Sequence, residues 1–339
     1  MAAADLNADG RSELIINNIV ISENESGTPK IRNTLSAAEG SNCTTFAASL
    51  DQDHPKDIQL IMGDGVYNST GKLLFQLANS GYNAVADIRK DIPGLEIIQS
   101  GGGHLAIYNG LTGAPIFQKN LMEFTELTCP DGNVGGGPPT VGDFRGDGTS
   151  QIAVATGRSL TIFDSLGNMI AGSLTKDCSS RSTGITSFDF NGDGQPEIIY
   201  GDENYLRIYH MDKSTNLNPI YEILNPSGTL LEYPVVADVN GDHISELVVV
   251  SNNYAALRLY DDPAVGEKAN GITGLRVFKS QVDRSWMPTR SIWNQYAYFV
   301  NNVFDNLSAT SSTLASNSDL NLYFRRNTQG ENSSLRCIE

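Results

Sequence analysis

The stretch Asp189-Phe-Asn-Gly-Asp-Gly-Gln-Pro-Glu197, which runs directly into Ile198-Ile-Tyr200, decides the fold of this chain. A second stretch of the same kind, Asp238-Val-Asn-Gly-Asp-His-Ile-Ser-Glu246, stands between Pro234-Val-Val-Ala237 and Leu247-Val-Val-Val250. Apolar and β-branched runs on both sides of a polar, Gly-containing segment are typical of two strands joined by a loop. We therefore expect each acidic segment to connect a pair of strands.

The acidic segment recurs at a spacing of 38 to 56 residues, a period that indicates propellers or repeat arrays. Six copies are readable, and they begin at Asp5, Ser49, Asp87, Asp143, Asp189 and Asp238. Several copies continue into a second apolar hairpin, such as Leu160-Thr-Ile-Phe163 followed by Met169-Ile170. About four strands in each repeat predict an all-β protein, a β-propeller of four-stranded blades.

The repeats occupy residues 1–300, which we interpret as the propeller. The repeat pattern changes after the sixth copy, with an apparent insertion at Tyr254 to Asn270. Residues 301–339 are rich in Ser and Asn and include a strand-like piece, Leu320-Asn-Leu-Tyr-Phe324. We interpret this tail as a closing segment or as part of a last blade.

The composition excludes several classes of function. The 339 residues carry 23 Lys and Arg against 39 Asp and Glu, a net charge of −16, so nucleic acid and anionic membranes are unlikely to attract the chain. Apolar runs such as Leu247 to Val250 are far shorter than the roughly 20 residues needed to span a bilayer. Met1 to Asp5 resembles no signal peptide, and we interpret the chain as a mature fragment or a cloned domain.

The acidic pattern D-x-[DN]-x-D-G-x-x-E places oxygen-bearing side chains at positions 1, 3, 5 and 9, and a main-chain carbonyl at position 7 can join them. Calcium takes six to eight oxygen ligands, whereas zinc prefers His and Cys, so the pattern predicts Ca²⁺. Three copies have every ligand: Asp5, Asn7, Asp9, Arg11 and Glu13; Asp189, Asn191, Asp193, Gln195 and Glu197; and Asp238, Asn240, Asp242, Ile244 and Glu246. The alternative is a set of Asx turns that hold no metal.

The other three copies are incomplete. We expect weaker metal binding in the second copy, through Ser49, Asp51, Asp53, Pro55 and Asp57. The third copy has Arg89 at position 3 and one extra residue before Glu96, so we expect no metal there. The fourth has Arg145 at position 3 and Gln151 at position 9, and we expect a pseudo-site held by a pair between Arg145 and a carboxylate.

These loops resemble the FG-GAP or VCBS repeat family, the calcium-loop propellers of the integrin α-subunit head and of many bacterial secreted proteins. The resemblance covers roughly residues 1 to 280, and Thr289-Arg-Ser-Ile-Trp-Asn-Gln-Tyr-Ala-Tyr298 is similar to a C-terminal module of bacterial proteins of this kind. It implies a propeller that is commonly seven-bladed, with calcium loops on one face and recognition by loops on the opposite face. Seven blades are therefore favoured, and the six readable copies leave six as the alternative.

Three further patterns have competing interpretations. Cys129 and Cys178 each precede the first strand of neighbouring repeats, which predicts a bridge between blades; Cys43 and Cys337 could join the first blade to the tail. Arg145-Gly146-Asp147 spells an adhesive tripeptide, but its place inside an acidic loop favours a degenerate loop. The remaining pattern is aromatic, either a sugar-stacking platform or core, and comprises Trp286, Trp293, Tyr296 and Tyr298.

We identify no catalytic group, since the four histidines are scattered and neither H-E-x-x-H nor G-x-S-x-G occurs. The sequence therefore predicts a calcium-binding extracellular propeller, secreted or at the cell surface, that recognises a protein or glycan ligand and serves in adhesion. A polysaccharide lyase or a lectin on the same fold is the alternative, and a structural spacer is a third. The sequence leaves the oligomeric state open.

Overall fold

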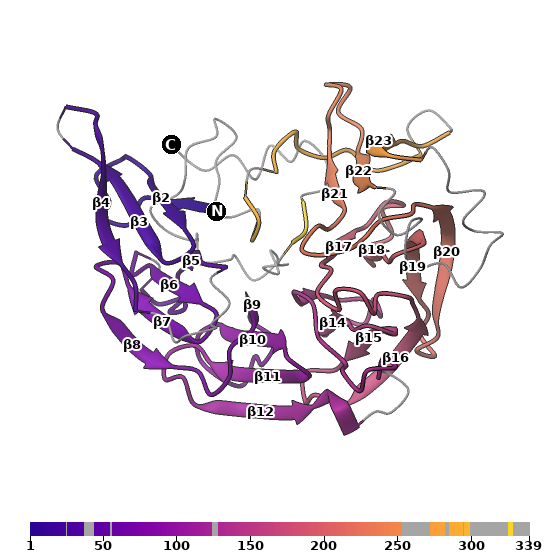
Figure 1. The fold of residues 1–339 in the computed structure, drawn as a ribbon, viewed down its shortest axis with the longest axis horizontal. Helices are drawn as coiled ribbons and strands as arrows, with labels where there is room; N and C mark the ends of the chain where they lie inside the picture. Colours follow the sequence, from indigo (N-terminus) through magenta and orange to yellow (C-terminus); the bar gives the residue numbers. More distant parts are fainter. Residues whose placement is uncertain are drawn as a thin grey trace. The chain divides into compact units, whose positions relative to one another are not determined.

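The computed structural model describes residues 1–24, 26–36, 44–54, 56–123, 128–252, 272–281, 285–293, 295–298 and 325–327. Within these residues the fold is all-β, and the only helix is a 3₁₀ turn, η1 (Leu121–Glu123). No helix in the described part of the chain is long and apolar enough to cross a bilayer. The strands form six antiparallel sheets, five of four strands and one of three (Figure 1).

Contact density divides the chain into two compact units. The first unit holds two complete sheets and most of a third, each ordered along the chain. The strands of the first sheet are β1 (Ala2–Ala4), β2 (Glu13–Ile16), β3 (Ile19–Glu23) and β4 (Pro29–Thr34). Those of the second are β5 (Phe46–Ala48), β6 (Gln59–Met62), β7 (Gly65–Asn68) and β8 (Leu73–Gln76). Those of the third are β9 (Tyr82–Ala86), β10 (Glu96–Gly101), β11 (His104–Asn109) and β12 (Pro115–Asn120).

The second unit holds the other three sheets, with the same sequential order of strands. The fourth sheet comprises β13 (Thr140–Gly142), β14 (Gln151–Ala155), β15 (Ser159–Phe163) and β16 (Met169–Leu174). The fifth comprises β17 (Ile185–Phe188), β18 (Glu197–Gly201), β19 (Tyr205–Met211) and β20 (Leu217–Leu224). The sixth comprises β21 (Val235–Ala237), β22 (Glu246–Ser251) and β23 (Gly274–Phe278). Four-stranded meanders are the form of β-propeller blades, so the predicted four strands are confirmed in five of the six described sheets.

The fifth sheet buries both faces of its inner strands, which explains why β18 reads as an unbroken apolar run. On β18, Ile198 and Tyr200 belong to a core cluster shared with the fourth sheet, and Ile199 belongs to a cluster shared with the sixth. Successive side chains on a strand point to opposite faces, so the fifth sheet packs against the fourth on one side and the sixth on the other. Burial of these apolar side chains is the main force that holds the unit together.

A recurrent turn joins the third and fourth strands in the first five sheets. In each, the side-chain Oδ1 of the first turn residue accepts main-chain N–H groups two to four residues later, and these first residues are Asn24, Asn68, Asn109, Asp164 and Asp212. Asn and Asp make such bonds readily because their side chains are short. The turn fixes where the outer strand begins.

The disulfide predicted between neighbouring repeats is confirmed. Cys129 and Cys178 are bonded, with their Cα atoms 5.7 Å apart, and they precede β13 and β17 respectively. The bridge therefore joins the entry segments of the fourth and fifth sheets. Cys43 and Cys337 lie outside the described residues, as do the segments Tyr254 to Asn270 and Leu320 to Phe324.

The aromatic residues near the C-terminal end of the repeats pack against the protein. The ring of Trp286 lies 4.5 Å from that of Phe190, and the ring of Trp293 lies 6.0 Å from that of Tyr233. Tyr298 is fully buried. These contacts favour the interpretation of this stretch as core.

Candidate metal centre

The acidic connections between the first two strands of each sheet are numbered loop 1 to loop 6. They comprise residues 5–13, 49–59, 87–96, 143–151, 189–197 and 238–246. In every sheet a Glu or Gln begins the second strand and pairs with the last residue of the first, as Glu197 pairs with Phe188. The strand register therefore fixes the position of this side chain at the base of the loop.

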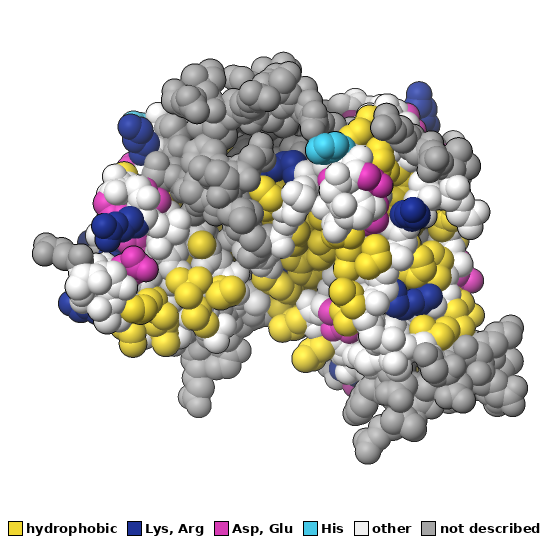
Figure 2. All heavy atoms as spheres, turned by 90° about the horizontal axis from the view of Figure 1, so that it is seen from above, with side chains coloured by type: hydrophobic (Ala, Val, Ile, Leu, Met, Phe, Trp, Pro, Cys, Tyr) yellow, Lys and Arg dark blue, Asp and Glu magenta, His cyan; other side chains and the backbone are white. Residues whose placement is uncertain are grey.

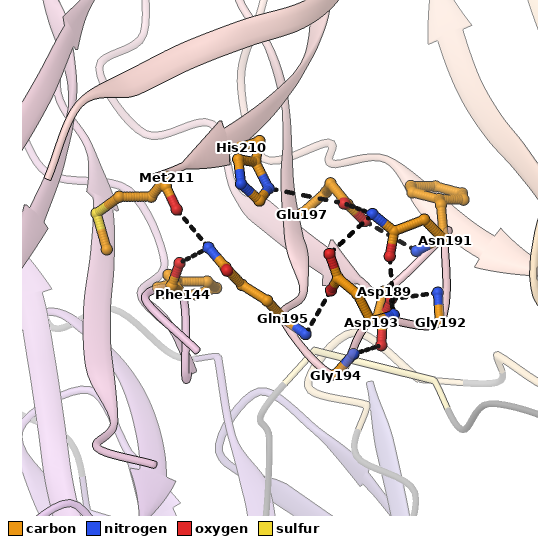
Figure 3. A network of polar contacts seen from close by, with 11 residues as sticks. Phe144, Asp189, Asn191, Gly192, Asp193, Gly194, Gln195, Glu197, His210 and Met211 are labelled. Carbon is orange, nitrogen blue, oxygen red and sulfur yellow. Dashed lines mark hydrogen bonds and ion pairs between the residues drawn. The ribbon is translucent and has the colours of Figure 1, made fainter. Parts of the chain in front are cut away.

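Loop 5 shows the arrangement of a complete loop (Figure 3). Oδ1 and Oδ2 of Asp189 accept the N–H groups of Asp193 and Gly194 at 3.2 and 2.8 Å. The side-chain amide of Asn191 donates to Oδ2 of Asp193 at 3.1 Å and to Oε1 of Glu197 at 3.2 Å. Two carboxylates, those of Asp193 and Glu197, thus converge on one amide NH₂ group.

Loops 1 and 6 repeat the hydrogen bonds of the position-3 amide. The position-3 amide of Asn7 donates to Asp9 at 3.0 Å and to Glu13 at 3.3 Å. The equivalent bonds of loop 6, from Asn240 to Asp242 and Glu246, measure 3.0 and 2.8 Å. The position-7 residues also correspond, since each N–H donates to the position-5 carboxylate at 2.8 Å; they are Arg11, Gln195 and Ile244. The structure thus brings together the position-3, position-5 and position-9 side chains of the three complete loops.

The turn at position 6 explains why glycine is common there. Gly10 and Gly194 have φ angles of 83° and 88°, a conformation that favours glycine. His243 occupies the same position in loop 6 with a φ of 67°. Its N–H still donates to Asp238 Oδ2 at 3.0 Å, and His is among the residues that adopt positive φ more readily than most.

Burial makes these loops electrostatically costly without a cation. Glu197 is 1% exposed, and burial, with the charges of Asp189 and Asp193, raises its pKa to about 7. Burial also raises the pKa of Glu13 and Glu246 above the usual value. A bound divalent cation would offset the repulsion among the carboxylates.

Loop 2 is longer than the complete loops. Gln59 begins β6 and accepts the N–H of Leu50 at 2.9 Å, as Glu197 accepts the N–H of Phe190 at 2.8 Å. The place of the position-9 Glu is thus taken by Gln59, two residues beyond Asp57. Asp51 is hydrogen-bonded to the Nδ1 atom of His54 at 2.8 Å. Pro55 lies outside the described residues, and the weaker site predicted for Ser49, Asp51, Asp53, Pro55 and Asp57 remains a prediction.

Loop 3 uses its arginine internally. Arg89 donates two hydrogen bonds to the carboxylate of Asp91, at 2.9 and 2.8 Å. The guanidinium thus pairs with the loop's own carboxylate, and Glu96 accepts the main-chain N–H of Arg89 at 3.0 Å in place of a side-chain amide. Oε1 of Glu96 has no hydrogen-bond partner among the described residues, and burial raises the pKa of this carboxyl to about 7.

Loop 4 is the predicted pseudo-site. Arg145 Nη2 lies 2.5 Å from Asp147 Oδ2, so the predicted pair between Arg145 and a carboxylate is confirmed. The side-chain amide of Gln151 donates a hydrogen bond to the main-chain carbonyl of Thr149 at 2.7 Å. Thr149 stands at position 7, so this bond occupies the position-7 carbonyl. Arg145 and Asp147 thus pair with each other inside the loop, which favours the interpretation of the tripeptide as part of a degenerate loop.

The donor set of loops 1, 5 and 6 fits calcium. Each offers three carboxylates, an Asn and a position-7 carbonyl, all hard oxygen donors. Within the described residues no group of three or more His, Cys, Asp or Glu side chains is already gathered as a metal site. The Asn amide lies between two carboxylates instead, so an ion that binds must displace those two hydrogen bonds.

Three features of these loops were not predicted from the sequence. Gln59 was missed because two extra residues displace it from the acidic pattern. The side chain of Gln195 reaches the carbonyl of Phe144 in loop 4 at 2.6 Å, and no local pattern predicts such a bond. Residues 285–290 contact loops 5 and 6 through their main chain, which leaves no signature in the sequence.

Comparison with known proteins bears on the fold. No curated protein matches the sequence of this chain. The crystal structure of the V. cholerae biofilm matrix protein Bap1 aligns with a TM-score of 0.62 and 16% identity, over 96% of this chain and 84% of that one. The rhamnogalacturonan lyase YesW aligns with a TM-score of 0.50 and 21% identity, over 74% of this chain and 43% of that one. The chain thus spans less than half of the lyase, and at these identities both likenesses show the fold alone.

The family comparison matches a single segment. The FG-GAP-like repeat family matches residues 189–249, which include loops 5 and 6 and the strands between them. The family resemblance is therefore confirmed at the loops whose ligand sets are complete. Residues 189–249 match the FG-GAP-like repeat family, within a chain whose fold is similar to that of the biofilm matrix protein Bap1.

Proposed function

We propose that this protein is a calcium-stabilised β-propeller that acts outside the cell or at a cell surface as an adhesion or macromolecular recognition module. The observation that carries the proposal is the shared geometry of loops 1, 5 and 6, where a position-3 amide joins the position-5 carboxylate to the buried position-9 carboxylate. The disulfide between Cys129 and Cys178 supports an oxidising, extracellular location. Bap1 is named as a biofilm matrix protein, and a matrix role is the form of adhesion that the shared fold favours.

Calcium has a structural role in this account. The position-1, 3, 5 and 9 side chains and the position-7 carbonyl of each complete loop hold the ion, which neutralises the converging carboxylates. At about 1 mM calcium and a Kd near 0.1 mM, each ion adds roughly 1.4 kcal/mol to the free energy of unfolding. Three ions add about 4 kcal/mol, a sizeable part of a domain's usual stability.

The ligand is a protein or glycan, and the proposed recognition surface lies away from the metal loops. In each sheet the acidic loop joins the first two strands, and the next loop joins the second and third strands at the opposite end. In the fifth sheet that next loop is residues 202–204, where Glu203 accepts the N–H of Ser179 at 2.7 Å. Such hydrogen bonds hold the loops at this end of the unit in fixed positions, as recognition requires.

The surface carries little positive charge to attract an anionic partner. Lys and Arg side chains of the described residues stand apart from one another among apolar and acidic ones on the face seen in Figure 2. The net charge of −16 agrees with this distribution. A neutral glycan or a protein is therefore the partner that the charge favours.

We also propose a seventh blade, to which residues 301–339 contribute. On β22, Leu247 and Val249 lie in the core shared with the fifth sheet, while the alternate residue Val250 is 46% exposed. Val250 pairs with Leu275 of β23, which is 71% exposed, so both point to the same face. An apolar face of this kind on a propeller sheet is where the next blade packs.

The double substitution Val250→Glu/Leu275→Glu tests the seventh blade. If another blade packs on this face, two buried charges lower the free energy of unfolding by more than about 2 kcal/mol. If the sheet ends a six-bladed fold with a free face, the change stays within about 0.5 kcal/mol. Leu174→Glu, at a site 72% exposed on β16, is the matched control.

Recognition is tested with arrays of glycans and matrix proteins, probed in calcium and in chelator. Retention in calcium that weakens in chelator supports the adhesion module. Release of unsaturated sugar ends from pectin-type polysaccharides would instead assign a lyase, which is how YesW is named. Retention of sugars without turnover by a site that chelator leaves intact would assign a calcium-independent lectin.

A further inference from the structure

Residues 285–290, called here the strap, lie against loop 5. The N–H of Met287 donates to the main-chain carbonyl of Phe190 at 2.9 Å. The ring of Trp286 lies 4.5 Å from the ring of Phe190. The Met287 side chain also covers Gly192, where an added Cβ would come within 2.7 Å of the sulfur. The strap therefore holds the second and fourth residues of the loop.

The strap also holds loop 6. The N–H groups of Asp238 and Ser245 donate to strap carbonyls at 3.1 and 3.3 Å. Ile244 forms an antiparallel bridge with Pro288 of the strap. Both ends of loop 6 are thus fixed by the segment that also fixes loop 5.

The main-chain groups that bond to the strap belong to residues in or next to the proposed metal ligands. Phe190 stands between Asp189 and Asn191 in loop 5. Ser245 stands between the position-7 carbonyl of Ile244 and the carboxylate of Glu246. An ion that orders these ligands therefore also orders the main-chain groups to which the strap bonds.

We propose that the strap couples loops 5 and 6, so that calcium at either loop raises the affinity of the other. This inference rests on the proposed calcium function. The ion favours the loop conformation that accepts the strap, and a docked strap favours the same conformation in the second loop. Coupling of this kind is reciprocal, and in proteins it typically changes affinity by about 5- to 150-fold.

The contact between the strap and loop 5 can be followed by the fluorescence of Trp286. The chain has two tryptophans, and Trp286 lies in the strap against Phe190. Replacing the other by Trp293→Phe makes emission report the strap alone. The fluorescence of Trp286 is therefore expected to change as loops 5 and 6 fill with calcium.

The experiment is a calcium titration of the full chain by calorimetry and by Trp286 fluorescence. Asp193→Ala removes a carboxylate of loop 5 and is expected to lower the affinity of loop 6 at least fivefold. Asp9→Ala is the matched control, because loop 1 has the same ligand set and belongs to the other compact unit. It is expected to leave the affinities of loops 5 and 6 within about twofold.

A strap variant separates coupling from binding. Trp286→Ala is expected to leave one calcium bound at each of loops 5 and 6 while the coupling disappears. Trp286→Phe keeps the ring contact with Phe190 and is expected to retain the coupling, which guards against a folding defect. Unchanged affinity of loop 6 in Asp193→Ala, with no response of Trp286, would overturn the inference while the calcium function stands. A wild-type titration that detects no bound calcium would overturn both.

Discussion

The side-chain amide of Gln195 donates a hydrogen bond to the main-chain carbonyl of Phe144 at 2.6 Å (Figure 3). It also donates to the carbonyl of Met211. Gln195 stands at position 7 of loop 5, and Phe144 stands at position 2 of loop 4. A loop with a complete ligand set is thereby tied to a neighbouring loop that lacks one.

Replacing Gln195 by Ala is expected to destabilise the protein. The carbonyls of Phe144 and Met211 would lose this donor, and a buried polar group that loses its partner costs about 1 to 3 kcal/mol. Urea unfolding monitored by circular dichroism measures the loss. Gln118→Ala, on the exposed side of β12, is the control and should change the free energy of unfolding by less than about 0.5 kcal/mol. Equal effects of the two substitutions would show that the bond between loops contributes nothing.

Glu96 is expected to make stability depend on pH. It is 0% exposed, and burial raises the pKa of its carboxyl to about 7 from 4.5 in the unfolded chain. The folded state therefore binds this proton more tightly than the unfolded chain does. The resulting stabilisation is fully present below about pH 4.5 and is lost as the pH rises to about 7.

Glu96→Gln removes this contribution. Loops 2 and 4 already have Gln at the same place, Gln59 and Gln151, so the amide fits the strand register. The difference in free energy of unfolding between wild type and variant should shift by on the order of 3 kcal/mol between pH 4.5 and pH 8 in chelator. Glu123→Gln, at an exposed site, serves as the control. Parallel pH profiles for wild type and Glu96→Gln would refute the raised pKa.

The parts of the fold that could be predicted are those that leave a pattern within a few residues of the sequence. The strand pairs on either side of Asp189 to Glu197 were predictable, because alternating burial and a Gly-rich turn leave a pattern within a few residues. Asp57 was aligned with Glu13 by acidic character, yet the pairing of Ala48 with Gln59 places the equivalent side chain two residues further on. A two-residue insertion in a loop changes no apolar pattern, so only the strand register reveals it.

Contacts over long distances in the sequence were not predictable. The strap approaches Phe190 and Ser245 through main-chain atoms, which every residue type possesses. The bond from Gln195 to Phe144 spans 51 residues between side chain and backbone. The disulfide was predictable because Cys129 and Cys178 hold equivalent places in adjacent repeats, so the repeat itself aligned them.

Loss of the disulfide is expected to lower stability substantially. Cys129 and Cys178 are separated by 49 residues, and opening a loop of that size costs about 4 kcal/mol in the chain-entropy description. We expect Cys129→Ser/Cys178→Ser to lose about 2 to 4 kcal/mol of unfolding free energy. A reductant should destabilise the wild type and leave the double variant unchanged. Full stability of the double variant would show that sheet packing alone fixes the entry segments.

Loop 4 can be converted into a metal site if the ligand assignment is right. Arg145→Asn/Gln151→Glu gives loop 4 the ligand pattern of loop 5, and Asp143 and Asp147 are already present. Calorimetry should then detect one additional calcium per chain. Arg145→Ala/Gln151→Ala removes the same native contacts without adding ligands and should add none. No additional calcium in the Asn/Glu variant would show that the spacing of ligands is insufficient to make a site.

The number of calcium ions bound by the full chain tests the central claim most directly. Equilibrium dialysis against about 1 mM calcium, with the bound metal measured by emission spectrometry, should find at least three ions per chain. The triple variant Asp9→Ala/Asp193→Ala/Asp242→Ala should lose three, and chelation should lower the unfolding free energy of the wild type by about 4 kcal/mol. Wild-type protein that binds no calcium under these conditions, with the same stability in chelator, would contradict the account.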